Sequence, residues 1–195
     1  MTKTEEKMQL YDECMGKIPV LTKKIAREEN MTQVYKCIAE SIYDICLTFL
    51  GNNEELELSY CVALKKSNGY DVAVNNNMLE TPNFGVIESR YFENEQTCIF
   101  SQTYFYLIFK ATDEIESIVY FEGANGTLSS FFVKVIETIY TVVDLILSSK
   151  KNSGITDDEQ ELFVNLAKEV ETATGGNETH VDRVAKYTRL ILKEM

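Results

Sequence analysis

The only histidine of the chain, His180, has the surroundings that point most directly to chemistry. It opens the run His-Val-Asp-Arg-Val-Ala at residues 180–185, and Glu171-Thr172 precede it by nine and eight residues. A neutral imidazole is a strong ligand for borderline divalent metals, and a neighbouring group can hold its second ring nitrogen. A lone histidine at a helix start is more often a cap or a surface residue than a ligand. Because catalytic metal sites need three or more protein ligands, other residues would have to complete any site at His180.

The run ETATGGNETHVDRVAKYTRLI, residues 171–191, resembles the opening of an HD-GYP domain, a metal-dependent hydrolase of cyclic dinucleotides. The resemblance implies that His180 is the first metal ligand and that a complete domain carries iron or manganese. Many family members have a glutamate ligand four residues earlier, where this chain has Gly176, and the nearest acid is Glu178. The paired His-Asp, the later histidines and the Gly-Tyr-Pro motif are not among these 195 residues. We therefore expect no cofactor and no phosphodiesterase activity in this chain, and a metal-dependent cyclic-di-GMP phosphodiesterase in the full-length parent.

Other residues with reactive side chains allow two interpretations each. The aromatic side chains of residues 104–109 could line a ligand pocket on an open sheet face, but core packing is favoured. Cys61 or Cys98 could tether a chromophore or sense redox state, but no flanking basic group predicts a lowered thiol pKa, so a buried core position is favoured. Five acids could pair for acid–base work, although solvated loop charges explain them better; they are Glu93, Glu95, Asp113, Glu114 and Glu116.

Periodicity predicts the elements that would position these groups. Apolar residues at helical spacing predict a helix over residues 30–50, capped by Asn30 or Thr32. After this helix, the spacing of the apolar residues changes to every second position. Alternating apolar and polar residues predict a half-buried strand at 56–65, followed by a turn and a returning strand at 70–74.

The middle of the chain predicts a sheet that is covered on both sides. Residues 75–96 are polar and indicate a long connection with at most one short element. Three strands follow at 97–101, 103–111 and 115–121, and they are apolar on both faces. Residues 127–150 predict an amphipathic helix whose polar stripe argues against a membrane span.

Both ends of the chain are expected to be helical. Residues 3–28 are charged and mildly helical, with a break at Pro19. Residues 150–154 are the clearest candidate for a domain boundary in the chain. Beyond it, Thr-Asp-Asp-Glu at 156–159 has the form of a capping box, and a last helix begins near His180.

This order of elements resembles the GAF/PAS-like sensory fold. Residues 104–130, YFYLIFKATDEIESIVYFEGANGTLSS, are similar to the GAF-like domain that precedes HD-GYP in many bacterial response regulators. The predicted class is α+β, with a central antiparallel sheet flanked by helices and a short helical extension. The predicted domains are an N-terminal helical segment at 1–29, a GAF-like regulatory domain at 30–150, and the first helices of a truncated HD-GYP domain at 151–195.

Composition limits the kinds of partner. The formal net charge is −12, from 31 acidic and 19 basic residues, which argues against a nucleic-acid surface and against anionic membranes. Five scattered cysteines without a Cys-x-x-Cys pair, and a start without a secretory signal, predict a reducing cytoplasm.

These features predict a regulatory, sensory and dimerisation module of an HD-GYP-type cyclic-di-GMP phosphodiesterase signalling protein that is not catalytic on its own. The alternative is a free-standing GAF-like module that binds a small ligand or another protein. The apolar faces of residues 30–50 and 127–150 predict a homodimer through these helices. The resemblance also implies a receiver domain or another upstream signalling partner.

Overall fold

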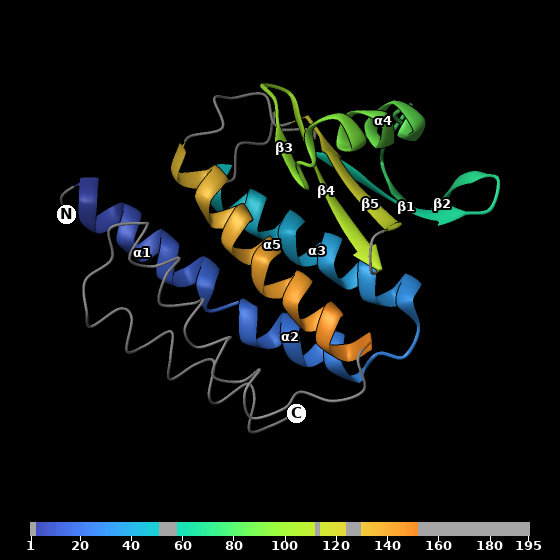
Figure 1. Ribbon diagram of the computed structural model, residues 1–195. Coiled ribbons are helices and arrows are strands. Elements are labelled where there is room, and N and C mark those ends of the chain that lie inside the picture. The colour runs from blue at the N-terminus through green and yellow to red at the C-terminus, as the bar shows by residue number, and fades with distance from the viewer. Residues whose placement is uncertain (1–2, 51–57, 112–113, 124–129, 152–195) are drawn as a thin grey trace. The chain divides into compact units, whose positions relative to one another are not determined.

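A computed structural model of the chain describes residues 3–50, 58–111, 114–123 and 130–151 (Figure 1). It has an α+β fold with one five-stranded antiparallel sheet, as the sequence predicts. The elements in chain order are α1 (Lys3–Met15), α2 (Ile18–Arg27), α3 (Met31–Leu50), β1 (Ser59–Lys66), β2 (Gly69–Asn76), α4 (Phe84–Asn94), β3 (Cys98–Phe100), β4 (Tyr104–Ala111), β5 (Glu114–Glu122) and α5 (Ser130–Lys151).

Contacts divide the chain into two compact units. One unit is Asn30–Val133, which holds α3, the whole sheet, α4 and the first turn of α5. The other described residues are α1, α2 and the part of α5 from Lys134 onward. The candidate functional residues that the structure describes lie in the first unit.

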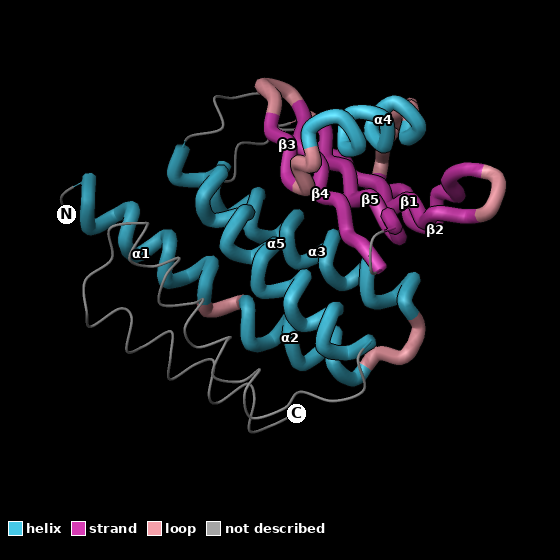
Figure 2. The backbone as a smooth tube through the Cα atoms, viewed as in Figure 1, coloured by secondary structure: helices cyan, strands magenta, loops and turns pink. Residues whose placement is uncertain are grey.

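The sheet has the strand order β2-β1-β5-β4-β3 (Figure 2). The β1–β2 hairpin forms one edge, the three-residue strand β3 forms the other, and β5 is central. Strands β4 and β5 are buried along most of their length, which confirms the expectation of apolar strands in the middle of a covered sheet.

Two register shifts decide which side chains share a face. One lies between Val62 and Ala63 in the β1–β2 pair. The other lies between Phe109 and Lys110, where Phe109 is paired with Ser117 but Lys110 with Ile115. The extra residue in β5 lets side chains three positions apart point to the same side, although regular strands alternate.

Helix α3 covers one face of the sheet. Its predicted cap is confirmed, because Asn30 Oδ1 accepts hydrogen bonds from the backbone amides of Thr32 at 2.9 Å and Gln33 at 3.4 Å. Phe109 of β4 lies 5.6 Å from the ring of Tyr35, measured between centroids. The Tyr35 hydroxyl donates a 2.9 Å hydrogen bond to Glu116 of β5, so a polar contact also fixes this helix to the sheet.

Helix α4 covers the opposite face (Figure 1). This 11-residue helix occupies much of the stretch from 75 to 96, where the sequence indicated mainly a connection. Asn83 caps it by accepting from two backbone amides, and Phe84, Ile87 and Tyr91 are buried at helical spacing. Three buried positions give too weak a period to stand out beside Pro82 and a run of asparagines, which is why the helix was underestimated.

The remaining helices differ from expectation in detail. The break near the N-terminus falls between α1 and α2, and Pro19 lies in the first turn of α2, where its missing amide proton costs no helical hydrogen bond. Helix α5 is described from Ser130 onward, so its predicted start at residue 127 lies outside the described residues. Among the described helices, none is long and apolar enough to cross a membrane.

Candidate functional site

Three tyrosines form an array on the sheet face that α4 covers. Tyr104 and Tyr106 lie two residues apart on β4, and Tyr120 of β5 is the register partner of Tyr106. Their rings are nearly parallel. Ring centroids of Tyr104 and Tyr106 are 6.4 Å apart at 6°, those of Tyr104 and Tyr120 are 5.6 Å apart at 21°, and those of Tyr106 and Tyr120 are 6.4 Å apart at 15°. We call these three side chains the tyrosine face.

The other side of the same strands is built from phenylalanine. Phe105 and Phe121 stack with centroids 4.6 Å apart, and both are fully buried, as is Phe109. Alternation along a strand sends successive side chains to opposite faces, so β4 and β5 carry phenylalanine towards α3 and tyrosine towards α4. Phenylalanine would fill a core of similar size without a polar atom. Within β4 and β5, tyrosine hydroxyls therefore lie on one face only, although Tyr60 of β1 lies beside Phe121 on the other face.

Arg90 of α4 interacts electrostatically with Tyr104 and Tyr106. It is exposed, and hydrogen bonding with Tyr104, followed by the electrostatic contribution of that residue and of Tyr106, raises the pKa of its guanidinium. A guanidinium has five N–H donors in a fixed plane. Two tyrosine hydroxyls cannot occupy all five, so Arg90 keeps donors for solvent or a ligand.

The hydroxyls of Tyr106 and Tyr120 are protonated at neutral pH. Burial raises the pKa of Tyr106, and Arg90 partly offsets that increase. Burial raises the pKa of Tyr120 as well, and the nearby Glu122 carboxylate adds to it. A protonated phenol can donate a hydrogen bond, so this face presents donors.

The N-terminal part of α4 is held to the β1–β2 hairpin by a second polar cluster. Lys65 of β1 binds both carboxylate oxygens of Glu88 at 2.7 Å, and its ammonium lies 4.6 Å from the ring centroid of Tyr70. The Tyr70 ring also packs 5.6 Å from that of Phe84. The Tyr70 hydroxyl is buried and has no hydrogen-bond partner among the described residues. Burial, and then the neighbouring Glu88 carboxylate, raise its pKa.

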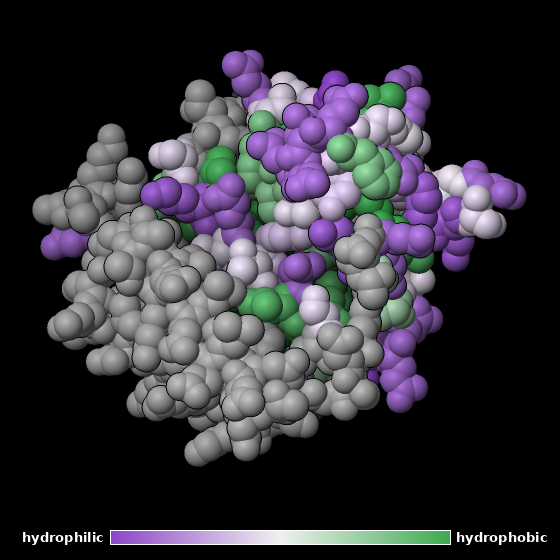
Figure 3. All heavy atoms as spheres, in the orientation of Figure 1, coloured by the Kyte–Doolittle hydropathy of each residue, from purple (hydrophilic) through white to green (hydrophobic). Residues whose placement is uncertain are grey.

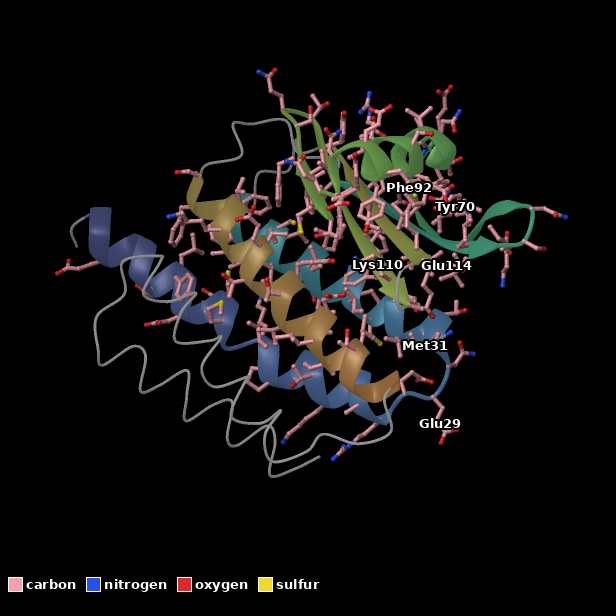
Figure 4. All side chains as sticks on the ribbon, viewed as in Figure 1. Glu29, Met31, Tyr70, Phe92, Lys110 and Glu114 are labelled. Atoms are coloured by element: carbon pink, nitrogen blue, oxygen red, sulfur yellow. The ribbon has the colours of Figure 1, made fainter. Side chains whose placement is uncertain are left out.

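The C-terminal part of α4 meets the far end of β4. The ammonium of Lys110 lies 5.7 Å from the ring centroid of Tyr91, and Phe92 makes an edge contact with the same ring at 5.5 Å. Figure 4 shows Tyr70 and Lys110 extending from the sheet on the side of α4, with Phe92 on the helix. Side-chain contacts thus hold α4 to the sheet on both sides of Arg90 in the sequence.

The cysteines considered from sequence lie in different environments. Cys61 of β1 is fully buried beside Tyr120, its register partner on β5, and burial, with a smaller contribution from Glu122, raises its pKa to about 12. Such a thiol is a poor nucleophile at neutral pH. Cys98 lies on the edge strand β3 and is partly exposed. No two described cysteines form a disulfide, because all five are free.

The structure does not bring the candidate acids into one pair. Glu93 and Glu95 are exposed at the end of α4, and Glu114 is exposed at the start of β5. Glu116 accepts the hydrogen bond from Tyr35, so it has a packing role that loop solvation did not predict. Asp113 lies outside the described residues.

The predicted metal ligand, His180, also lies outside the described residues, as do Gly176 and Glu178. Within the described part of the chain, no three side chains of the His, Cys, Asp or Glu types come close enough to hold a metal ion.

No protein-family model, curated protein or solved structure matches this chain.

The site residues that sequence reasoning missed are Arg90 and Tyr120. Tyr104 and Tyr106 were noted as possible pocket residues, and the recurrence of tyrosine at Tyr120 in the next strand was the signal available for extending that set.

Proposed function

We propose that residues 30–150 form a GAF-like regulatory module that binds a small ligand on the tyrosine face and serves an HD-GYP-type cyclic-di-GMP phosphodiesterase signalling protein. The observation that supports ligand binding best is the separation of tyrosine and phenylalanine on the two sides of β4 and β5. Only the sequence at residues 180–185 supports the link to cyclic-di-GMP hydrolysis.

The chemistry of the tyrosine face favours recognition over catalysis. Its groups are phenols and a guanidinium, which donate hydrogen bonds but have no reason to exchange protons near neutral pH. The partly exposed Tyr104 and the exposed Arg90 lie at the border of the buried cluster, where a ligand can reach them without unfolding the core. Ligand sites commonly combine an apolar lining with a few convergent polar groups.

We propose that α5 transmits the bound state. It begins in the same compact unit as the sheet, where Phe132 contacts Phe105 of β4 at 5.9 Å and Phe49 of α3 at 5.3 Å. A shift of the sheet face would therefore reach the first turn of α5. In the full-length parent this would change how α5 joins the helix expected after Thr156, and so tune a metal-dependent hydrolase.

The second candidate function is a free-standing module that binds another protein. The outer side of α4 supports it, because Val86 is 47% and Phe92 63% exposed among otherwise hydrophilic side chains (Figure 3). Isolated exposed apolar residues are common on protein surfaces, so this observation is weaker than the tyrosine face.

We keep the homodimer, the upstream receiver domain and a cytoplasmic location as parts of the proposal. The apolar positions of α3, such as Val34, Ile38 and Ile42, are already buried in the single chain. A dimer through α3 would therefore have to use its remaining positions. Sedimentation equilibrium of the chain tests this, since a mass of one chain at micromolar concentration would exclude a stable dimer.

A thermal-shift screen tests ligand binding. Purines, cyclic nucleotides and tetrapyrroles are added to the purified chain and to a variant with Tyr104→Phe and Tyr106→Phe. We expect at least one compound to raise the Tm of the chain and to raise that of the variant much less. No stabilisation by any compound, or equal stabilisation of both proteins, would count against a ligand site on the tyrosine face.

A further inference from the structure

We propose that α4 is a lid over the tyrosine face and that the ion pair between Lys65 and Glu88 holds it closed. This inference rests on the proposed ligand-binding function and names how its site is regulated. Tyr106 and Tyr120 are almost fully buried in the cluster that α4 completes, so a ligand that contacts them needs α4 to move. The opening of α4 can be measured without a ligand, and its failure is therefore distinct from a failure of ligand binding.

Helix α4 is the less firmly held of the two helices that cover the sheet. Its three buried side chains, Phe84, Ile87 and Tyr91, each remain between 5% and 9% exposed. Helix α3 buries seven apolar side chains on the other face, each at most 1% exposed; they are Val34, Tyr35, Ile38, Ala39, Ile42, Ile45 and Cys46. Local opening begins where the fewest apolar contacts are buried, so α4 can leave the sheet while α3 stays in place.

The segment that carries α4 has a possible hinge at each end. Among the described residues, only Asn77 and Glu95 combine a side chain with a left-handed backbone, at φ of 60° and 55°. These two residues precede and follow α4. A return to the usual negative φ at either position relieves strain and changes the direction of the chain. The backbone can therefore turn at both ends of the segment without disturbing the strands.

The contact that opposes this opening joins α4 to the β1–β2 hairpin. The Lys65 ammonium lies 2.7 Å from each carboxylate oxygen of Glu88, and this is the one ion pair between α4 and the sheet in the described residues. The two side chains are 35% and 21% exposed, so solvent screens the pair less than a fully exposed one. The Tyr70 ring, 4.6 Å from the same ammonium, helps to position Lys65. Loss of this ion pair should favour the open state.

Two buried thiols distinguish opening of α4 from unfolding of the chain. Cys61 of β1 is fully buried in the cluster that Phe84, Ile87 and Tyr91 of α4 complete, so its thiol becomes accessible when α4 leaves. Cys46 of α3 is 1% exposed, and its thiol becomes accessible only when α3 leaves the core. When opening and closing are fast relative to labelling, the rate of alkylation follows the population of the open state.

The test is the rate at which iodoacetamide alkylates Cys61 and Cys46 in the full chain, measured by mass spectrometry. Glu88→Gln should raise the rate at Cys61 by about 3- to 10-fold and change that at Cys46 by less than about 2-fold. Glu93→Gln is the matched control, because it makes the same charge change on the same helix at an exposed residue without an ion pair in the described part of the chain. It should leave both rates unchanged.

A second variant breaks the same ion pair from the strand. Lys65→Gln changes the net charge in the opposite direction to Glu88→Gln, so a similar acceleration at Cys61 would exclude net charge as the cause. Because both variants remove one interaction, the double variant should be little faster than either single variant. Lys65→Gln also replaces Glu88→Gln as the test if the latter does not fold.

Two results would overturn the lid. One is an unchanged alkylation rate at Cys61 in both variants. The other is equal acceleration of Cys61 and Cys46, which would mean that the ion pair stabilises the whole fold.

The outcome for ligand binding is separate. A compound from the thermal-shift screen should bind Glu88→Gln more tightly than the unmodified chain, by the factor that Cys61 alkylation gives, because more of the variant is open. Binding of equal affinity with an unchanged rate at Cys61 would remove the lid and keep the proposed function. Faster labelling of Cys61 without binding of any compound would keep the lid and remove the proposed ligand site.

Discussion

At the scale of single residues, the choice between phenylalanine and tyrosine carries most of the functional information. Phe105 and Phe121 pack one face without polar atoms, whereas Tyr106 and Tyr120 place hydroxyls on the other. Tyrosine hydroxyls also hold the helices. Tyr35 binds Glu116 across the α3 side of the sheet, so a phenol there stabilises the fold instead of forming part of a site.

The contribution of that bond can be measured. Tyr35→Phe removes the 2.9 Å hydrogen bond and leaves the partly buried Glu116 carboxylate without this donor. Because hydrogen bonds to charged groups contribute more than neutral ones, we expect the free energy of unfolding to fall by about 1–3 kcal/mol in urea denaturation. Tyr43→Phe is the control, since Tyr43 is also on α3 and its ring contacts Tyr60 at 5.5 Å. A loss of equal size in the control would contradict the assigned role.

Thiol reactivity separates the buried cysteines from the accessible ones. Burial raises the pKa of Cys61 to about 12 and that of Cys14 to about 11, so both are thiols at pH 8. Alkylation of the native chain with iodoacetamide, followed by mass spectrometry, should modify Cys37 and Cys98 first and these two much more slowly. Modification of Cys61 as fast as that of Cys98 would show that the sheet face beside Tyr120 is accessible to solvent.

At the scale of elements, α4 decides whether the tyrosine face becomes a site. The strands are predictable, because apolar and polar residues alternate along β1, whereas β4 and β5 are short runs of aromatic and aliphatic residues. The helix is not, since only Phe84, Ile87 and Tyr91 mark its buried side. Arg90 could therefore not be assigned to the site from sequence. Its proximity to Tyr104 depends on how α4 packs against β4, and no local sequence pattern predicts that packing.

The C-terminal end of α4 has a non-glycine residue in a backbone conformation that favours glycine. Glu95 is the C-cap and has φ of 55°, in the left-handed region where a side chain is disfavoured. Glu95→Gly should raise the free energy of unfolding by about 0.4–1 kcal/mol.

The matched control for the cap lies two residues earlier in the chain. Glu93 lies within the exposed part of α4, so Glu93→Gly should lower stability by about 0.5–1 kcal/mol. Both variants lose one exposed negative charge, which removes charge as an explanation. Equal effects of the two substitutions would mean that the cap conformation is not maintained in solution.

At the scale of the whole molecule, sequence patterns gave the α+β class but could not give the strand order. Strands β1 and β2, and likewise β4 and β5, are antiparallel neighbours in both sequence and sheet, and such hairpins follow from short connections with turn residues. The pairing of β1 with β5 joins Tyr60 to Phe121, and no short-range rule predicts a contact over that separation. The cap at Asn30 was predictable for the opposite reason, because its hydrogen bonds span two and three residues.

The expectation that this chain regulates but does not catalyse can be tested on the chain itself. One imidazole cannot hold a catalytic metal, so the purified chain with added Mn²⁺ or Fe²⁺ should not hydrolyse cyclic di-GMP. His180→Ala should leave this result unchanged. Hydrolysis that requires added metal and disappears in His180→Ala would contradict a purely regulatory role.

Ligand binding on the tyrosine face is tested most directly by NMR of the full chain labelled on its tyrosine rings, with Tyr104→Phe and Tyr106→Phe used to assign the signals. The titrant is the compound that stabilises the chain most in the thermal-shift screen. We predict that the ring signals of Tyr104, Tyr106 and Tyr120 shift together and saturate, while those of Tyr35 and Tyr43 on α3 do not. Shifts confined to α3, or no shift at saturating ligand, would contradict the site.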